Sequence, residues 1–246
     1  MILVVDAGNT RTKWAVFGLD GKMAEQGFFI NAELPQAQAP KAWQSCVRAV
    51  VASVAHPQVE AGIADLLKTF AIAADWLKSQ AQSCGLKNGY QAPEKLGIDR
   101  WAAMLAAWKN HAQQTTSCLV VNAGTALTID AVYQNVFIGG LIAPGWGGLR
   151  NSFTSQTALV SSENGHYQDF PKNTADASYS GALNAMAGAV LIEFNQLAKK
   201  AQQTPALVLS GGDAALLQTA LKALELSPIL VDDLVLNGLF LLSEAQ

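Results

Sequence analysis

The chain has few charged residues. Only 14% of its 246 residues are Asp, Glu, Lys or Arg, whereas 50% are hydrophobic. This composition provides a large apolar core and argues against intrinsic disorder. The formal net charge is −3 and the sequence has no basic cluster, so we do not expect nucleic acid as the main ligand. A small anionic substrate is still compatible with this balance, because it needs only local positive charge.

Cysteines and long apolar helical runs are scarce as well. Cys46, Cys84 and Cys118 are far apart and form no CxxC or Cys/His spacing, so neither zinc nor a disulfide framework is predicted. A reduced, cytoplasmic location is the simplest expectation. The uncharged run 131–149 contains Pro144 and several glycines, which predicts a strand and a Gly-rich loop instead of a membrane span. With no leader pattern before the first strand, we expect a soluble protein that does not bind membranes.

The common catalytic signatures are also missing. The sequence contains no GxxxxGK[ST] motif, no GxGxxG after a predicted strand and no GxSxG elbow. His56, His111 and His166 are scattered without metal-ligand spacing, and each is interpreted as an ordinary surface or core residue. The remaining chemistry must therefore come from carboxylates, hydroxyls, backbone amides, Lys13 and Arg100.

The first thirteen residues form the most distinctive stretch. The apolar run 2–5 ends at Asp6, a polar turn follows at 7–10, and a second strand-like run extends from Lys13 to Phe17. Gly and Asn favour a sharp turn, so a hairpin is predicted. The turn is either an ordinary polar hairpin tip or a site for a metal–polyphosphate, which needs a carboxylate, amides, a hydroxyl and an ammonium group.

The same organisation returns in the second half of the chain. A third strand at 23–30 completes an antiparallel meander in the first half. In the second half, the strand 118–121 leads to the Gly turn 122–125 and to further strands. We predict an α/β fold of two similar halves, with a boundary near 112–117.

Two helices carry the remaining expectations. The helix predicted at Glu94–Ala112 holds Asp99-Arg100, which is either a structural ion pair or a base beside an anion-binding guanidinium. Together with Asp6, Asp99 fits phosphoryl transfer. The helix predicted at Ala175–Ala201 has an uncharged middle, 181–192, and a helix that is apolar all round must be buried all round. It therefore favours contact with another subunit.

These motifs, in their order, resemble those of the type III pantothenate kinases, a family in the superfamily of acetate and sugar kinases, heat-shock ATPases and actin. The matching segments are Asp6–Thr10 with Lys13, Gly97–Arg100, Gly124–Ala126 with Thr128, Gly139–Gly145, Asn173-Thr174 and Ser210–Asp213. The resemblance implies two ribonuclease-H-like domains, each a mixed sheet flanked by helices, with an interdomain cleft. Residues 1–114 would form an N-terminal actin-like ATPase subdomain, and 115–246 a C-terminal one with the dimerisation helix.

The resemblance also implies roles for individual residues. ATP phosphates would be bound by Asp6, Ala7, Gly8, Asn9, Thr10, Arg11, Thr12, Lys13 and Thr125. Pantothenate would be bound by Tyr90, Gly97, Ile98, Asp99, Arg100 and Thr174, with Thr174 reaching across a homodimer interface. Asp99 would be the base, Asp6 would lie near Mg²⁺, and Gly211-Gly212 would lie near the adenosine.

One position departs from the family pattern. The family commonly has Asp in the DxGTA turn, where it helps to bind a monovalent cation, K⁺ or NH₄⁺. This chain has Asn122 there, so the resemblance implies a weakened cation site. Asn122 could instead only cap its turn by side-chain hydrogen bonding. The partners expected are pantothenate, ATP and a second copy of the chain. The alternative functions are a regulatory accessory protein or another small-molecule kinase on the same fold.

Overall fold

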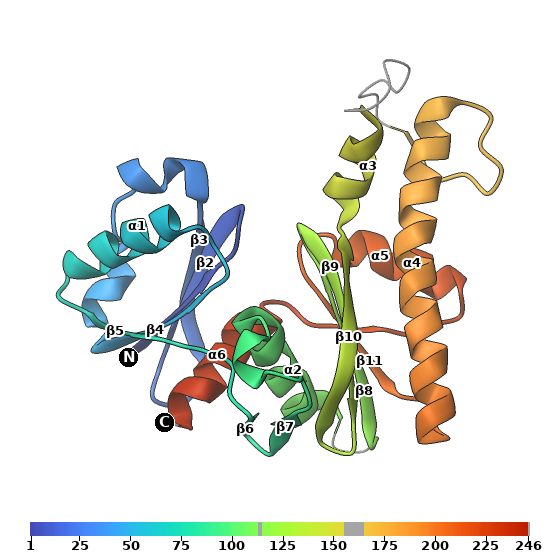
Figure 1. Cartoon of the computed structure of the whole chain (residues 1–246). Coiled ribbons are helices and arrows are strands. Elements are labelled where there is room, and N and C mark those ends of the chain that lie inside the picture. Colours follow the sequence, from blue (N-terminus) through green and yellow to red (C-terminus); the bar gives the residue numbers. More distant parts are fainter. Residues whose placement is uncertain (113–114, 155–164, 246) are drawn as a thin grey trace. The chain divides into compact units, whose positions relative to one another are not determined.

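The computed structural model describes residues 1–112, 115–154 and 165–245. The chain forms two compact units (Figure 1). The first unit comprises Met1–Asn110 and Asp233–Gln246, and the second comprises His111–Asp232. The break at residue 110 lies close to the predicted one, but the C-terminal helix belongs to the first unit, whereas the sequence analysis placed it in the second.

The first unit is built on a mixed sheet. Its strands are β1 (Ile2–Ala7), β2 (Arg11–Phe17), β3 (Met23–Ile30), β4 (Arg48–Ser53) and β5 (Ala73–Trp76). Their spatial order is β3-β2-β1-β4-β5. The first three strands are antiparallel, and β4 and β5 extend the sheet in parallel. A short antiparallel pair, β6 (Gln82–Ser83) and β7 (Leu86–Asn88), follows in the chain.

The second unit repeats this topology. Its strands are β8 (Ser117–Ala123), β9 (Ala126–Tyr133), β10 (Val136–Pro144), β11 (Ala206–Ser210) and β12 (Ile229–Leu230). Strands β8, β9 and β10 are antiparallel neighbours, whereas β11 pairs in parallel with β8 and β12. Each unit therefore has a meander of three strands and two added parallel strands. The predicted fold class, an α/β pair of ribonuclease-H-like sheets flanked by helices, is confirmed.

Six α-helices complete the described part of the chain: α1 (Pro57–Lys68), α2 (Ile98–His111), α3 (Trp146–Thr154), α4 (Thr174–Ala201), α5 (Ala214–Ala223) and α6 (Leu234–Glu244). Three short 3-10 helices lie at η1 (Asn31–Gln36), η2 (Lys41–Ser45) and η3 (Pro93–Lys95). The predicted helix at Glu94–Ala112 was therefore wrong at its start. Pro93 opens only a 3-10 turn, Leu96 is extended, and the α-helix begins after Gly97. The sequence also predicts a helical stretch after the Gly-rich loop that extends through Thr157, and this end lies outside the described residues.

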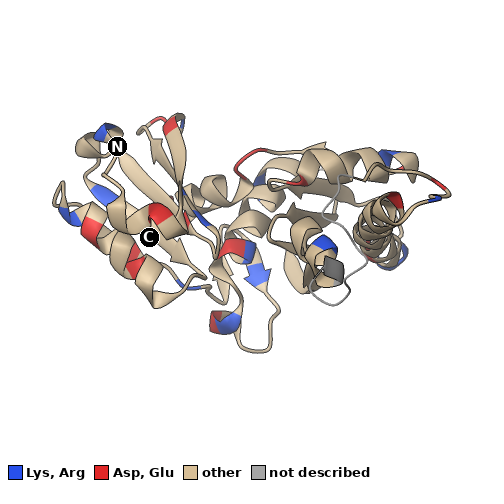
Figure 2. Ribbon diagram, turned by 90° about the horizontal axis from the view of Figure 1, so that it is seen from above, with Lys and Arg blue, Asp and Glu red and all other residues tan. Residues whose placement is uncertain are grey.

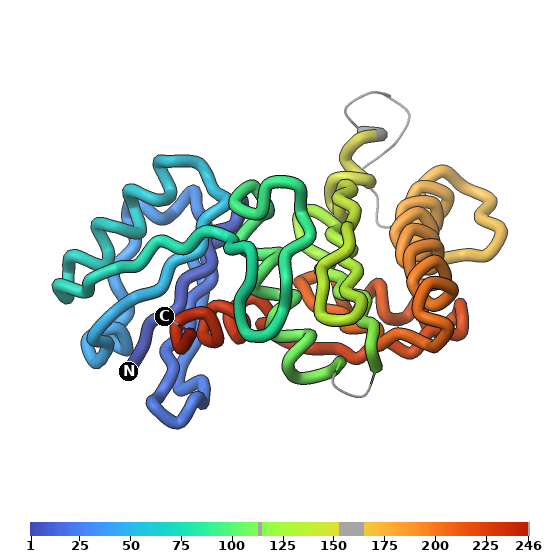
Figure 3. The backbone as a smooth tube through the Cα atoms, turned by 60° about the horizontal axis from the view of Figure 1, so that its bottom comes forward, coloured from blue at the N-terminus to red at the C-terminus, as the bar shows by residue number. Residues whose placement is uncertain are grey.

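Alternation along β1 determines where its polar residue lies. Leu3, Val5 and Ala7 belong to the apolar cluster beneath α1 and η2. Because successive strand residues point to opposite faces, Asp6 shares the other face with Ile2 and Val4. Helix α6 packs against β1, β2 and β4, and this contact is visible in Figure 3, where the C-terminal helix lies beside the first strands.

Helix α6 is an integral part of the first unit. A Cβ atom on Gly238 would lie 1.9 Å from the carbonyl oxygen of Ala102, so α6 and α2 meet backbone to backbone. The ring of Phe240 stacks on Phe17 with centroids 4.4 Å apart. The Arg48 guanidinium donates a hydrogen bond to the carbonyl of Ser243. These contacts explain why residues so late in the chain join the first unit.

Candidate active site

The hairpin between β1 and β2 brings the first two charged groups together. Asp6 and Lys13 are direct cross-strand partners, and such partners lie on the same face of the sheet. The opening turn, defined as Gly8–Arg11, joins the two strands, and the Gly8 N–H donates to the Arg11 carbonyl at 3.1 Å. The polar hairpin predicted from the sequence is confirmed.

Asn31 holds the opening turn from outside, and no sequence motif indicated it. Its side-chain amide donates to the carbonyls of Gly8 at 2.8 Å and Asn9 at 3.0 Å. Its backbone N–H donates to the Thr10 carbonyl at 3.1 Å. The buried Thr12 hydroxyl donates to the Asn31 side-chain oxygen at 2.9 Å. A polar residue directly after a strand is a weak signal, so this role becomes visible only in three dimensions.

Asp99 lies in the first turn of α2, at the helix end that favours negative charge. Its carboxylate also depends on Gly97, since a Cβ atom there would come within 2.5 Å of the Asp99 Oδ1 atom. The Asp99 carboxylate lies close enough to Asp6 for its charge to act on that group. Burial and, as the smaller cause, the Asp99 charge together raise the pKa of Asp6 from 3.8 to about 7, although the Lys13 charge acts to lower it.

Lys13 has a second carboxylate partner that sequence reasoning missed. Its Nζ atom lies 3.3 Å from the Asp233 Oδ1 atom, and the two side chains are 42% and 18% exposed. Asp233 precedes α6 and has a left-handed backbone with φ 52°, but its side chain makes no capping bond to that helix. The carboxylate is directed to Lys13 instead. The two residues are 220 positions apart in the sequence, so no local pattern could have paired these two groups.

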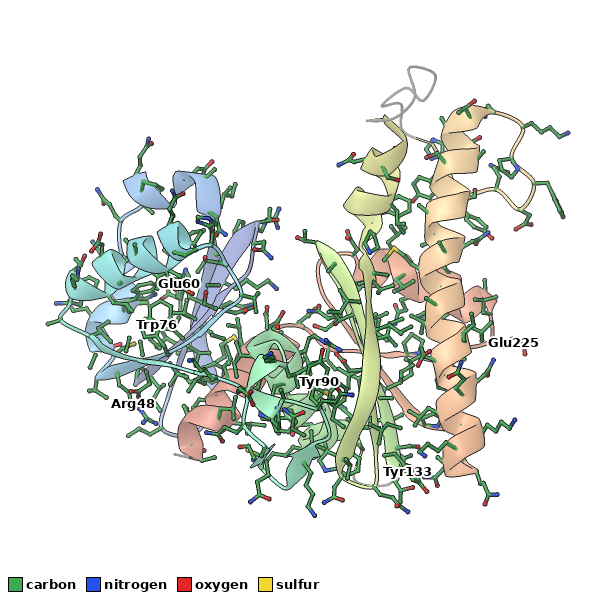
Figure 4. All side chains as sticks on the ribbon, in the orientation of Figure 1. Arg48, Glu60, Trp76, Tyr90, Tyr133 and Glu225 are labelled. Carbon is green, nitrogen blue, oxygen red and sulfur yellow. The ribbon has the colours of Figure 1, made fainter. Side chains whose placement is uncertain are left out.

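The other predicted substrate residues of the first unit lie near the start of α2. Arg100 is 7% exposed and Ile98 is buried. Tyr90, labelled in Figure 4, is half-exposed in the loop after β7. Asn88 braces this loop, because its side-chain amide donates to the carbonyls of Gln80 and Pro93, at 3.1 and 3.2 Å.

In the second unit, two glycine loops converge on the turn Asn122–Thr125. The Gly145 N–H donates to the Thr125 carbonyl at 3.1 Å, and a Cβ atom on Gly145 would lie 2.0 Å from the Gly124 carbonyl oxygen. Gly211 has φ +106°, and a Cβ atom there would lie 2.2 Å from the Ala123 carbonyl oxygen and 2.6 Å from the Asn122 Oδ1 atom. Only glycine fits at either position. The motif segments around Gly124, Gly145 and Gly211 are thus packed together, with Thr125 exposed at the turn.

Thr174 is the exposed first residue of α4. Asn173 caps this helix, since its side-chain oxygen accepts from the Asp176 N–H at 2.8 Å. The Asp176 carboxylate accepts from the backbone N–H of His166 at 2.8 Å, and this bond lowers the pKa of Asp176. The segment before α4 is thereby fixed to its first turn.

The charged groups among the described residues suit a metal cation that binds together with an anionic ligand. No group of three or more His, Cys, Asp or Glu residues that could hold a metal ion by itself occurs in the described ranges. Asp6 and Asp99 nevertheless present two carboxylates whose charges interact; the raised pKa of Asp6 comes first from burial and then from the Asp99 charge, which Lys13 opposes. Figure 2 shows basic and acidic residues interspersed along the described ribbon of each unit. None of the described helices could span a lipid bilayer, given their length and hydropathy.

Replacing Asp6 by Asn is expected to stabilise the ligand-free protein at high pH. The pKa of Asp6 is higher in the folded than in the unfolded state, so the unfolded chain loses this proton first as the pH rises from about 4 to about 7. Asp6 therefore lowers the free energy of unfolding progressively over this range. We expect Asp6→Asn to raise the melting temperature by roughly 5 °C at pH 8 and much less at pH 4.5. A difference between the two proteins that does not change with pH would contradict this account.

Comparison with known proteins identifies relatives of this chain. The sequence model of the family described as type III pantothenate kinase matches residues 2–194. A type III pantothenate kinase from Methylobacillus flagellatus is 40% identical over 247 residues, covering 97% of this chain and 96% of the relative. Another from Azoarcus sp. is 40% identical over 249 residues, covering 100% of this chain and 92% of the relative.

Two solved structures share the fold. A protein from Sinorhizobium meliloti described as a 2-dehydro-3-deoxygalactonokinase is 14% identical, with a TM-score of 0.61 and coverage of 100% and 98% of the two chains. A Campylobacter jejuni protein described as a Baf family transcriptional activator is 20% identical, with a TM-score of 0.60 and coverage of 98% of both. At these identities the likeness concerns the arrangement of helices and strands alone.

Proposed function

The chain belongs to the type III pantothenate kinase family, and on this premise we propose how it phosphorylates pantothenate. The reaction takes the phosphoryl group from ATP and gives 4′-phosphopantothenate, the first step of coenzyme A biosynthesis. The observation that carries the proposal is the cluster of Asp6, Lys13 and Asp99, formed by one hairpin and one helix start. Phosphoryl transfer needs positioning, charge compensation and a base, and these three groups supply them.

Asp99 is the base in this proposal. It accepts the proton of the pantothenate hydroxyl as the hydroxyl oxygen forms its bond to the γ-phosphorus, while the bond between that phosphorus and the ADP oxygen breaks. The first turn of α2 holds the carboxylate, and Gly97, which has no side chain, leaves the space that the Asp99 side chain occupies. The buried Arg100 and the half-exposed Tyr90, with Gly97 and Ile98, would bind the substrate.

The opening turn and Lys13 would bind ATP phosphates, and Thr125 of the second unit would add a phosphate contact. The Lys13 ammonium compensates charge on the transferring group. The residues fit a divalent cation, since Asp6 would hold Mg²⁺ through water or phosphate oxygens. When bound, the metal ion supplies charge neutralisation of the phosphate oxygens. Asp233 would keep the Lys13 ammonium in place between phosphate-bound states.

A coupled assay of ADP release tests this function. We expect turnover with pantothenate and none with a panel of sugars and small acids. Activity with a sugar would favour another small-molecule kinase, and no ATP-dependent activity would favour a regulatory protein. The same assay with and without KCl examines Asn122. Because an amide lacks the charge of the usual Asp, we propose that activity depends only weakly on K⁺ or NH₄⁺.

The protein is proposed to act as a homodimer through α4. One face of α4 carries four apolar or small residues at helical spacing, Gly181, Ala185, Gly188 and Ile192. The Ile192 side chain is 57% exposed. Strand β10, in the same unit, exposes Ile138, Leu141 and Ile142. Exposed apolar side chains on adjacent elements are typical of an interface. Thr174, at the start of the same helix, would then reach pantothenate bound by the partner.

Light scattering is expected to give the mass of a dimer for the wild-type chain and of a monomer for Ile192→Glu, because a buried unpaired carboxylate costs several kcal/mol. The monomeric variant should also lose most of its activity with pantothenate, since Thr174 of the partner is missing. Leu19→Glu is the matched control, an apolar-to-acidic change at a residue that is 91% exposed in the first unit. A wild-type monomer with full activity would refute the shared site.

A further inference from the structure

Three successive backbone carbonyl groups of the opening turn accept hydrogen bonds from one residue, Asn31. The carbonyls of Gly8 and Asn9 accept from the Asn31 side-chain amide, and the Thr10 carbonyl accepts from the Asn31 backbone N–H. The Thr12 hydroxyl, 1% exposed, donates to the Asn31 Oδ1 atom. That donor fixes the orientation of the side-chain amide, so that its NH₂ group faces the turn.

Because the peptide bond is planar, hydrogen bonds that fix these carbonyl groups also fix the direction of the N–H groups that follow them. In a trans peptide, the carbonyl of one residue and the N–H of the next point in opposite directions. Since the carbonyls of Gly8 and Asn9 are directed to Asn31, the N–H groups of Asn9 and Thr10 are directed to the opposite side of the turn. Consecutive N–H groups with a common direction form a concave site for anionic oxygens.

We propose that Asn31 is a positioning residue that gives the opening turn its phosphate-binding shape. This inference rests on the proposed role of the turn in ATP binding and adds a residue outside the motif. Asn31 does not touch the phosphates; it holds the carbonyls on the far side, so that the amide groups need no rearrangement when phosphate binds. Preorganisation of this kind strengthens binding by lowering the cost of ordering.

Asn31→Asp tests the proposal, since it keeps the size and the acceptor but replaces the NH₂ donor by an oxygen facing two carbonyls. Calorimetry should show a Kd for MgATP at least about tenfold higher than for the wild type, because two hydrogen bonds are lost and a repulsion is added. The Kd for adenosine should stay within about twofold, since adenosine has no phosphate for the turn to bind. In the kinase assay the KM for ATP should rise while the KM for pantothenate stays constant.

Gln26→Glu is the matched control, the same amide-to-carboxylate change at an exposed position of β3, and it should bind MgATP like the wild type. Asn31→Ala provides a second variant, which removes the donors without adding charge and should act in the same direction with a smaller effect. Unchanged ATP affinity in both Asn31 variants would overturn the proposal, as would an equal loss of ATP and adenosine binding. A wild-type chain that binds MgATP but does not phosphorylate pantothenate would overturn the proposed substrate and leave the role of Asn31 standing.

Discussion

Asp99→Asn is expected to lower the turnover number by about 10²–10⁴, the usual contribution of a general base. The amide has nearly the shape of the carboxylate, so it should occupy the space left by Gly97 without disturbing α2. It has no basic oxygen, however, and cannot accept the proton of the substrate hydroxyl. The loss should therefore fall on kcat, while the affinity for MgATP, measured by calorimetry, stays near that of the wild type.

Asp75→Asn is the control for this substitution, because Asp75 is an exposed residue of β5 on the same unit. It makes the same chemical change and should leave turnover unaltered. Near-normal turnover of the Asp99 variant would remove Asp99 from the role of base. A parallel loss of ATP affinity and turnover would instead indicate that the carboxylate acts in nucleotide binding.

Gly238→Ala should destabilise the first unit and lower activity together. A methyl group at this position would be placed 1.9 Å from the carbonyl oxygen of Ala102, so α6 must move away from α2. Overpacking of this kind costs about 1–3 kcal/mol in well-packed interiors, and a backbone neighbour cannot rotate away as a side chain can. The displacement would also separate Asp233, next to the start of α6, from Lys13.

Thermal unfolding and turnover should both report this change. We expect a melting temperature at least about 4 °C lower than that of the wild type. Gly147→Ala is the control, since Gly147 lies in α3 and a Cβ atom there meets nothing within 4 Å. Alanine favours a helix over glycine, so the control should be neutral or slightly stabilising. A Gly238 variant as stable as this control would show that the two helices separate without cost.

The parts of the fold that were predictable from sequence are those with local signals. Strands such as β1 and β8 are short apolar runs that end at Gly-containing polar turns, and these two cues define both hairpins. The start of α2 was misplaced because Pro93 gives the helix-start signal of a proline at the first helical position. That signal opened the 3-10 turn η3, and Gly97 separates it from the α-helix.

The candidate site was predictable only where its residues form motifs. Asp6, Lys13 and Asp99 lie in short patterns with a turn or a helix start, and such patterns indicate a chemical role. Asn31 and Asp233 act through contacts with residues 19 to 220 positions away, such as Thr12 and Lys13. Their own neighbourhoods, the end of a strand and the start of an apolar helix, are typical of ordinary capping residues. Only the folded chain distinguishes ordinary capping from these long-range contacts.

The return of α6 to the first unit affects the order of events during synthesis. Strands β1 to β5 and helix α2 leave the ribosome first, but the helix that covers the Asp6 face of β1 is translated after the entire second unit. Domains generally fold as units while the chain grows. The second unit can therefore fold completely while the first still lacks α6. The ion pair between Lys13 and Asp233 forms only after the second unit has been translated. The first unit, which contains the opening turn, is therefore the last to be completed.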